Sequence, residues 1–171
     1  MSGPAVEIRA ATPSDAESIR RVHAAAFERD AEAEIALGLV EREPACISLV
    51  AARADVVVGH VLFSPVRVDR RRFARAPMAL GPLAVAPEAQ RDGIGSALSR
   101  AGIEACRKVG APFVVVLGHP PYYPRFGFAP AARFGLTFAD LPPLDAFMAL
   151  ELAPGALANA GGAVRYAPEF G

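Results

Sequence analysis

An apolar segment followed by a glycine loop and a helical pattern is the feature that most constrains this chain. Apolar residues fill most of 80–86, Gly93 and Gly95 stand one residue apart, and a helical pattern continues to about residue 109. This order favours anion binding, because the first N–H groups of a helix have no intrahelical acceptor and the helix dipole adds positive potential there. Glycine also permits positive φ and the close approach of a ligand. The segment therefore predicts a site for a phosphate-bearing ligand.

Periodic segments on both sides of the loop predict a fold that mixes strands and helices. The wholly apolar segment 113–117 is typical of a central strand buried on both faces, and the order strand, helix, strand over 80–117 implies a parallel crossover. We expect the tail from 155 to 166 to be a loop. We expect strands near 6–9, 47–52, 56–63, 78–85, 113–117, 136–138 and 146–152, and helices near 12–27, 30–41 and 94–109.

Composition narrows the class of protein. With 171 residues, 53% of them hydrophobic and 21% charged, the chain is expected to form a single domain, 1–171. The formal net charge of +0 argues against a nucleic-acid or membrane-surface partner. No apolar stretch is long enough to span a membrane and no leader pattern is visible, so a cytoplasmic protein is expected. Cys46 and Cys106 match no metal-binding spacing, and no metal is expected.

Two common nucleotide-binding motifs do not fit the loop. A P-loop ends in Gly-Lys-Ser/Thr, but the only lysine of the chain is Lys108. A dinucleotide-binding unit places its glycines directly after an early strand and an acidic residue about 20 positions later. Here the strand after the helix ends in Leu117-Gly118-His119, which carries no acid.

A third interpretation rests on resemblance. Leu83-Ala84-Val85-x-Pro87 followed by Gln90-x-x-Gly93-x-Gly95 resembles the GNAT superfamily of N-acetyltransferases, in which Gln/Arg-x-x-Gly-x-Gly/Ala binds the pyrophosphate of acetyl-coenzyme A. The segments Tyr122-Tyr123, Phe126-Gly127-Phe128 and Val164-Arg165-Tyr166-x-x-x-Phe170 are similar to a bacterial subgroup of acetyltransferases. The resemblance implies an α/β GNAT fold whose central mixed sheet is splayed between the fourth and fifth strands and flanked by helices.

The resemblance also implies a reaction and a set of donor-binding residues. The donor would be acetyl-CoA, and the acceptor a primary amine of a small molecule or a protein, attacking directly in a ternary complex. Backbone amides of 91–96 would cradle the pyrophosphate, Gln90 would brace the loop, and an N–H near Val85 would polarise the thioester carbonyl. The cofactor-binding residues so implied are Leu83, Ala84, Val85, Gln90, Arg91, Asp92, Gly93, Ile94, Gly95, Ser96, Tyr122 and Phe126.

The catalytic groups are assigned less directly. Tyr123 is the expected general acid for the departing thiolate, because the similar subgroup places a tyrosine three residues before Phe-Gly-Phe; Tyr122 is the second choice. The two tyrosines could instead anchor a proline-rich turn. His119, His60 or an ordered water chain could serve as the base, whereas His23 is expected to be a packed structural residue. A homodimer, and a non-catalytic acyl-CoA-binding module of the same fold, remain open alternatives.

Overall fold

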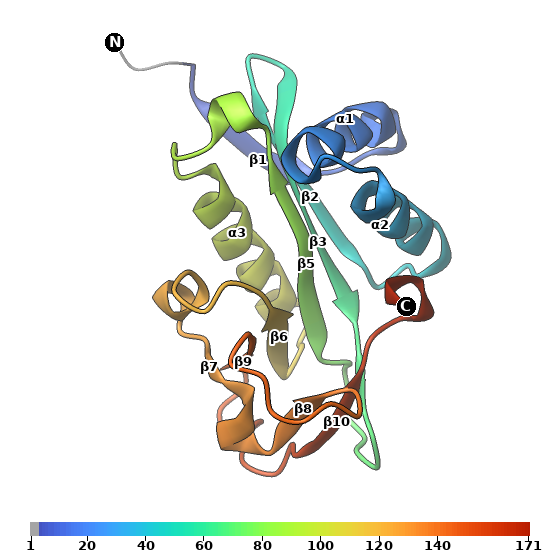
Figure 1. Ribbon diagram of the computed structural model, residues 1–171, viewed down its shortest axis with the longest axis vertical. Coiled ribbons are helices and arrows are strands. Elements are labelled where there is room, and N and C mark those ends of the chain that lie inside the picture. The colour runs from blue at the N-terminus through green and yellow to red at the C-terminus, as the bar shows by residue number, and fades with distance from the viewer. Residues whose placement is uncertain (1–3) are drawn as a thin grey trace. The chain divides into compact units, whose positions relative to one another are not determined.

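The computed structural model describes residues 4–171, and its strands form a mixed seven-stranded sheet and a smaller sheet (Figure 1). The strand order of the larger sheet is β1-β2-β3-β5-β6-β9-β7, and the smaller, three-stranded sheet has the order β4-β10-β8. The helices are α1 (Ala16–Phe27), α2 (Ala31–Arg42) and α3 (Ile94–Lys108). The strands are β1 (Val6–Ala10), β2 (Ile47–Arg53), β3 (Val56–Pro65), β4 (Arg67–Val68), β5 (Met78–Val85), β6 (Phe113–Leu117), β7 (Ala129–Pro130), β8 (Leu136–Phe138), β9 (Phe147–Glu151) and β10 (Gly162–Arg165).

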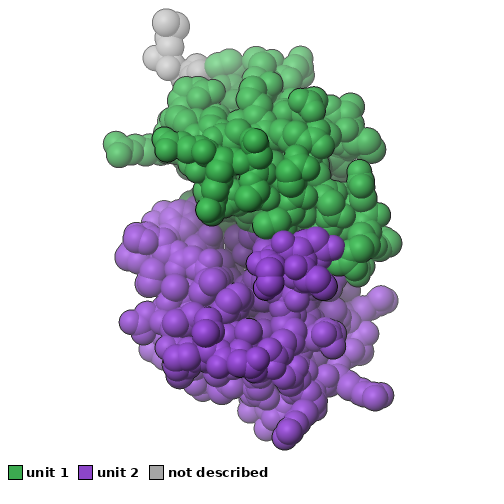
Figure 2. All heavy atoms as spheres, turned by 45° about the vertical axis from the view of Figure 1, so that its right-hand side comes forward, with its two compact units in different colours: residues 1–63, 82–102 green, residues 64–81, 103–171 purple. Residues whose placement is uncertain are grey.

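The chain divides into two compact units (Figure 2). Unit 1 comprises residues 1–63 and 82–102, and unit 2 comprises residues 64–81 and 103–171. Strands β3 and β5 and helix α3 each contribute residues to both units.

Unit 1 is built on the antiparallel strands β1, β2 and β3. The hairpin between β2 and β3 turns at Ala54 and Asp55, whose φ angles of +51° and +64° suit a tight two-residue turn. A register shift between Ala51↔Gly59 and Ala52↔Val57 leaves Val58 of β3 as the extra residue of a bulge beside Gly59. A Cβ placed on Gly59 would lie 3.0 Å from Leu98, so α3 packs closely against this part of β3.

The opposite face of these strands carries α1. A buried apolar cluster joins Ile19 and Val22 of α1 to Val50 and Val57 of the hairpin and to Ala84 of β5. Because successive side chains of a strand point to opposite faces, Gly59 meets α3 and the next residue of β3 faces α1. Unit 1 therefore places helices on both faces of its strands (Figure 1).

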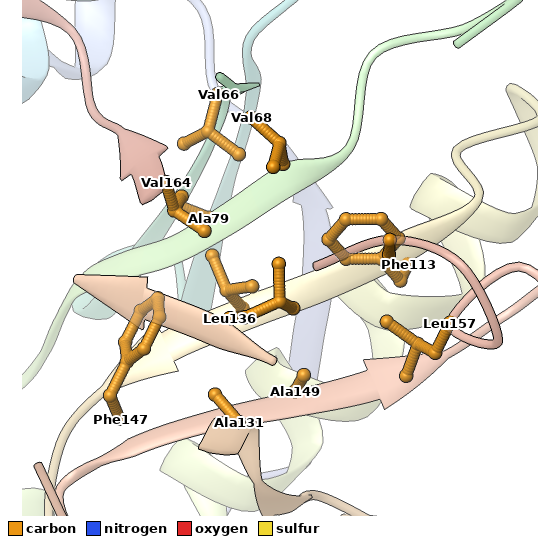
Figure 3. Close-up of a cluster of buried hydrophobic side chains, with 12 residues drawn as sticks. Val66, Val68, Ala79, Phe113, Ala131, Leu136, Phe147, Ala149, Leu157 and Val164 are labelled. Atoms are coloured by element: carbon orange, nitrogen blue, oxygen red, sulfur yellow. The ribbon is translucent and has the colours of Figure 1, made fainter. Parts of the chain in front are cut away.

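Unit 2 is organised around β6, the short apolar strand. Phe113, Val114 and Val115 are fully buried and Val116 is 1% exposed, as expected of a central strand. β6 pairs in parallel with β5 from Met78↔Val114 to Leu80↔Val116, and antiparallel with β9. One buried cluster fills the unit, and Figure 3 labels Val66, Val68, Ala79, Phe113, Ala131, Leu136, Phe147, Ala149, Leu157 and Val164 in it.

The predicted loop at 155–166 is wrong in its last part. β10 runs there, parallel to β8 from Gly162↔Leu136 and antiparallel to β4 at Val164↔Val68. The two glycines that precede Ala163 conceal the strand in the sequence. Gly162 has φ +152°, and a Cβ there would lie 2.9 Å from Val68, so this glycine permits a close approach of the chains.

Candidate functional site

The glycine loop closes directly onto the first turn of α3. A short 3-10 turn, Pro87–Ala89, leads into the loop, and Arg91 and Gly93 have φ angles of +68° and +79°. The Ala97 N–H donates to the Gly93 carbonyl at 3.0 Å, which places Gly93 at the N-terminal boundary of the helix. The amides of Ile94, Gly95 and Ser96 therefore belong to the first turn, where a helix supplies no acceptors of its own. This is the geometry of an anion-binding helix N-terminus.

Two side chains hold the loop in place. Gln90 Nε2 donates to the Val85 carbonyl at 3.0 Å, which ties the loop to the end of β5. Asp92 Oδ2 lies 3.0 Å from Arg53 Nη2, which ties it to the end of β2. Sequence reasoning suggested the first contact but missed Arg53, because that residue lies 39 positions before Asp92 and carries no local signal.

Exposure separates the anchoring residues of this segment from those that face outward. Ile94 and Ala84 are 3% and 2% exposed and pack into the interior of unit 1. Leu83 and Val85, on either side of Ala84 in β5, are half-buried. The segment from Gln90 to Gly93 is exposed. The segment from Gln90 to Gly93 is thus accessible to a ligand, while the buried Ala84 before it and Ile94 after it are fixed in the interior.

Tyr123 lies in unit 2, packed in an aromatic cluster. It is 8% exposed, and its ring centroid lies 5.0 Å from that of Tyr122, 6.2 Å from Phe126 and 5.7 Å from Phe128. A Cβ on Gly118 would collide with the Tyr123 ring, so that glycine is needed for the packing. Burial, and then the neighbouring Tyr122, raise the pKa of Tyr123 to about 12. The phenol therefore keeps its proton at neutral pH.

The other two residues predicted from the aromatic segment lie beside Tyr123. The rings of Tyr122 and Phe126 are 5.4 Å apart, and both side chains are half-buried. Arg125 donates through Nε to the Tyr122 carbonyl at 2.8 Å, with its guanidinium 4.3 Å from the centre of the Tyr122 ring. These contacts fix the short 3-10 turn Tyr123–Phe126 that follows β6.

The three histidines occupy different environments. His119 is exposed, just beyond the end of β6, and its carbonyl accepts a hydrogen bond from the Tyr122 N–H at 3.0 Å. His23 and His60 are 0% and 1% exposed, and His23 Nε2 lies 2.8 Å from His60 Nδ1. His23 is packed, as predicted, but its contact with His60 joins positions 37 apart and was not foreseen.

The predicted site residues fall into two groups. Unit 1 brings together Leu83 to Val85 and the loop Gln90 to Ser96, and unit 2 brings together Tyr122, Tyr123 and Phe126. Residues 4–171 hold no cluster of three or more His, Cys, Asp or Glu side chains arranged to bind a metal ion. No helix in the described chain combines the length and the apolar character that crossing a membrane requires.

Comparison with known sequences identifies relatives along most of the chain. Residues 7–131 match the family model of the acetyltransferase (GNAT) domain. The uncharacterized N-acetyltransferase YhbS of Escherichia coli K12 is 35% identical over 164 residues, covering 95% of this chain and 97% of YhbS. The uncharacterized N-acetyltransferase YjhQ of the same strain is 43% identical over 121 residues, covering 70% of this chain and 67% of YjhQ.

Solved structures agree with the sequence matches. The crystal structure of YhbS from E. coli in complex with CoA superposes with a TM-score of 0.88 at 33% identity, covering 99% of this chain and 95% of that one. A GNAT acetyltransferase from Brucella melitensis in complex with acetyl-CoA superposes with a TM-score of 0.80 at 33% identity, covering 98% of this chain and 99% of that one. The predicted superfamily, mixed α/β fold and enzyme class are thereby confirmed. The chain belongs to the GNAT family of acetyltransferases.

Proposed function

We propose that this protein transfers an acetyl group from acetyl-CoA to a primary amine, and that the loop at the start of α3 binds the pyrophosphate of the donor. The observation that carries the proposal is the left-handed Gly93 at the helix boundary, with the first-turn amides of α3 directly after it. The related structures from E. coli and B. melitensis hold CoA and acetyl-CoA, which supports the same donor here.

The residues of the loop fit an anionic ligand. Within the described chain, no heavy atom beyond the immediate neighbours of Gly93 lies within 4 Å of the position that a Cβ would take there, so the backbone is open to a ligand. Asp92 is paired with Arg53, which offsets the one negative charge in the loop. Arg91 is exposed and adds a positive charge next to the amides. The loop thus has room, donors and a favourable charge for a pyrophosphate.

The neighbouring strand would hold the rest of the donor. The parallel register of β5 with β6 ends at Leu80↔Val116, and Leu83, Ala84 and Val85 follow it. In the proposed complex their backbone groups hydrogen-bond the pantetheine arm, and the N–H near Val85 polarises the thioester carbonyl. Tyr122 and Phe126, which the resemblance assigns to donor binding, are half-buried in unit 2.

Proton transfer is assigned to Tyr123. Bound acetyl-CoA supplies the thioester carbonyl that the amine attacks, and the departing thiolate needs a proton. The raised pKa of Tyr123 keeps the phenol protonated at neutral pH, which is the state that a general acid needs. His119 is the exposed candidate for the base.

A thermal-shift experiment tests donor binding. At 100-fold excess over its Kd, acetyl-CoA would stabilise the protein by about 2.7 kcal/mol, which raises Tm by about 5–10 °C for a chain of this size. We expect this rise in the wild type and none in Gly93→Glu, whose side chain would occupy the anion site.

Gly155→Glu is the matched control. Gly155 has the same φ of +79° and open space at its Cβ position, so the substitution repeats the backbone strain outside the loop. Gly155→Glu should keep the full acetyl-CoA shift. The proposal is contradicted if the wild type shows no shift at millimolar acetyl-CoA, or if both variants lose the shift equally.

A further inference from the structure

A pocket of about 250 Å³ lies within unit 1, beside α1 and α2. Its wall is mostly apolar, from residues of the two helices and of the segment that precedes α1. Its polar lining consists of Thr12, Arg20, Glu41, Ser48 and His60. None of these residues was assigned a role in donor binding or acid catalysis, so the pocket is a second feature of the molecule.

The inner polar lining of the pocket continues into the core as a chain of hydrogen bonds. Ser48 Oγ lies 2.8 Å from His60 Nε2, and His60 Nδ1 lies 2.8 Å from His23 Nε2. Both imidazoles are almost completely buried, whereas Ser48 is half-buried and borders the pocket. The three side chains come from β2, β3 and α1. A continuous path of exchangeable protons therefore leads from the pocket into the interior.

The far end of the path lies within the electrostatic influence of a carboxylate, without a direct hydrogen bond to it. His23 Nδ1 and Glu32 Oε2 are both buried, and neither atom has a hydrogen-bond partner in the part of the chain that the structure describes. The two residues interact electrostatically, and Glu32 is also paired with Arg29. The Glu32 side chain is 15% exposed and reaches solvent.

Two tautomeric states of the path are possible. In one, Ser48 donates to His60 Nε2, His60 Nδ1–H donates to His23 Nε2, and His23 carries its proton on Nδ1. In the other, His23 Nε2–H donates to His60 Nδ1, His60 Nε2–H donates to Ser48 Oγ, and the Ser48 hydroxyl points its proton elsewhere. Conversion of the first state into the second moves one proton from the pocket end to the His23 end.

We propose that Ser48, His60 and His23 form a proton relay that takes the proton of an ammonium acceptor bound in this pocket and passes it to the His23 end, from which it leaves toward Glu32 and solvent. The inference rests on the proposed acetyl transfer and deepens it, by naming the residues that deprotonate the acceptor. The relay takes the place of the exposed His119 as the base.

The reaction balances with one proton released. The ammonium group R–NH3+ gives a proton to Ser48 Oγ as Ser48 passes its own proton to His60 Nε2. His60 then passes its Nδ1 proton to His23 Nε2, and His23 releases its Nδ1 proton toward Glu32 and solvent. The neutral R–NH2 forms a C–N bond with the acetyl carbon, the C–S bond breaks, and the amine's surplus proton reaches the thiolate by way of Tyr123. One ammonium and one thioester give one amide, one thiol and one proton.

The surroundings of the two histidines keep both imidazoles neutral, so neither ring retains an extra proton. Burial, and then His23, lower the pKa of His60 to about 3, although Asp15 opposes the effect. Burial lowers the pKa of His23 to about 4, opposed by Glu32. Neither ring holds a second proton at neutral pH, so a proton crosses the relay by exchange of tautomers.

The lining also limits the substrate class. Arg20 donates to Glu34 and Glu17 at 2.9 and 2.7 Å, so its positive charge is offset, whereas the exposed Glu41 adds negative charge to the pocket. A cationic head is therefore tolerated, and the apolar wall suits a short hydrocarbon body. We expect a small primary amine, with probes from propylamine to hexylamine and 2-phenylethylamine.

The test compares kcat/KM as a function of pH, by thiol release with the probe that gives the highest rate. Ser48→Ala and His60→Gln should each lower kcat/KM about 100-fold at about pH 7. The deficit should shrink to a few-fold or less at about pH 10, where roughly a quarter of an alkylamine is already neutral and needs no base. Ser99→Ala is the matched control, because Ser99 is a buried serine of α3 whose Oγ has no partner among residues 4–171. It should follow the wild type at every pH.

Each other outcome overturns a defined part of the inference. A deficit that is the same at all pH values would mean that Ser48 and His60 are only structural, and a pH-dependent deficit in His119→Gln alone would return the base to that residue. No turnover of any probe, with the acetyl-CoA thermal shift intact, would overturn the substrate class but leave donor binding standing. Loss of that shift in the wild type would instead refute the proposed function. If His60→Gln fails to fold, Ser48→Ala decides the test.

Discussion

At the scale of single residues, Asp15 shows how a buried carboxylate is held before α1. Arg9 binds it through two N–H groups, at 2.8 and 2.9 Å, and the Thr12 N–H donates to it at 2.8 Å. The hydrogen bonds from Arg9, then those from Thr12, hold the pKa of Asp15 well below its ordinary value, against the effect of burial. This cluster joins the end of β1 to the start of α1, and Thr12 of the cluster lines the pocket described above.

Asp15 should make the protein sensitive to acid. Its folded pKa lies below the unfolded value of about 3.9, so its contribution is complete above that pH and is lost as the pH falls further. Asp15→Asn should lower the free energy of unfolding by about 2 kcal/mol at pH 7, and by less at about pH 3. Urea denaturation at both pH values measures this. Asp55→Asn, in the exposed hairpin turn, should change the free energy of unfolding little at either pH. An Asp15→Asn deficit that persists undiminished at low pH would contradict the account.

Tyr123 carries a second prediction at this scale. Tyr123→Phe should lower kcat about 100-fold and leave the acetyl-CoA thermal shift unchanged, because only the proton donor is lost. Tyr166→Phe is the control, since Tyr166 Oη is buried without a partner within the described chain and its ring packs 5.1 Å from Phe138. Equal kcat in Tyr123→Phe and the wild type would mean that Tyr123 only anchors the proline-rich turn.

At the scale of elements, the sequence predicted what local patterns determine. The segment from β5 through α3 to β6 was predicted nearly to the residue, because apolar periodicity and helix-ending residues lie within it. The sequence did not predict β4 and β10, because each is short and is defined only by its pairing with a distant strand. Val68 of β4 pairs with Val164 of β10, 96 positions later. Sheet pairing of that kind is tertiary and leaves no periodic signal.

Two helical glycines make a matched pair for testing the packing of these elements. A Cβ on Gly102 of α3 would overlap the ring of Phe63, which is fully buried in β3, whereas a Cβ on Gly38 of α2 would meet nothing within 4 Å. Gly102→Ala should therefore lower the free energy of unfolding by about 2–3 kcal/mol. Gly38→Ala should raise it by about 1 kcal/mol, through helix propensity alone. Urea denaturation of both variants checks the pair. Similar stabilities of the two would show that α3 does not pack on Phe63 as described.

At the scale of the whole molecule, the donor loop and the other polar contacts differ in how predictable they were. Gln90, Gly93 and Gly95 lie within six residues, so the loop could be identified from its spacing. The pairs Arg53–Asp92 and His23–His60 join distant positions in unit 1, so they could not be identified from the sequence. The family model spans residues 7–131, which belong to both units. A single domain, a homodimer and a cytoplasmic location stay predictions.

Direct detection of acetyl transfer tests the central claim. The wild type is incubated with acetyl-CoA and the alkylamine probes, and with a lysine-containing peptide to represent protein acceptors. Mass spectrometry measures acetylated amine, and a thiol reagent measures free CoA. The account predicts acetylated product and thiol in equal amounts, both dependent on enzyme and amine. Acetyl-CoA that raises Tm but yields neither product would contradict it, and would indicate a non-catalytic acyl-CoA-binding protein.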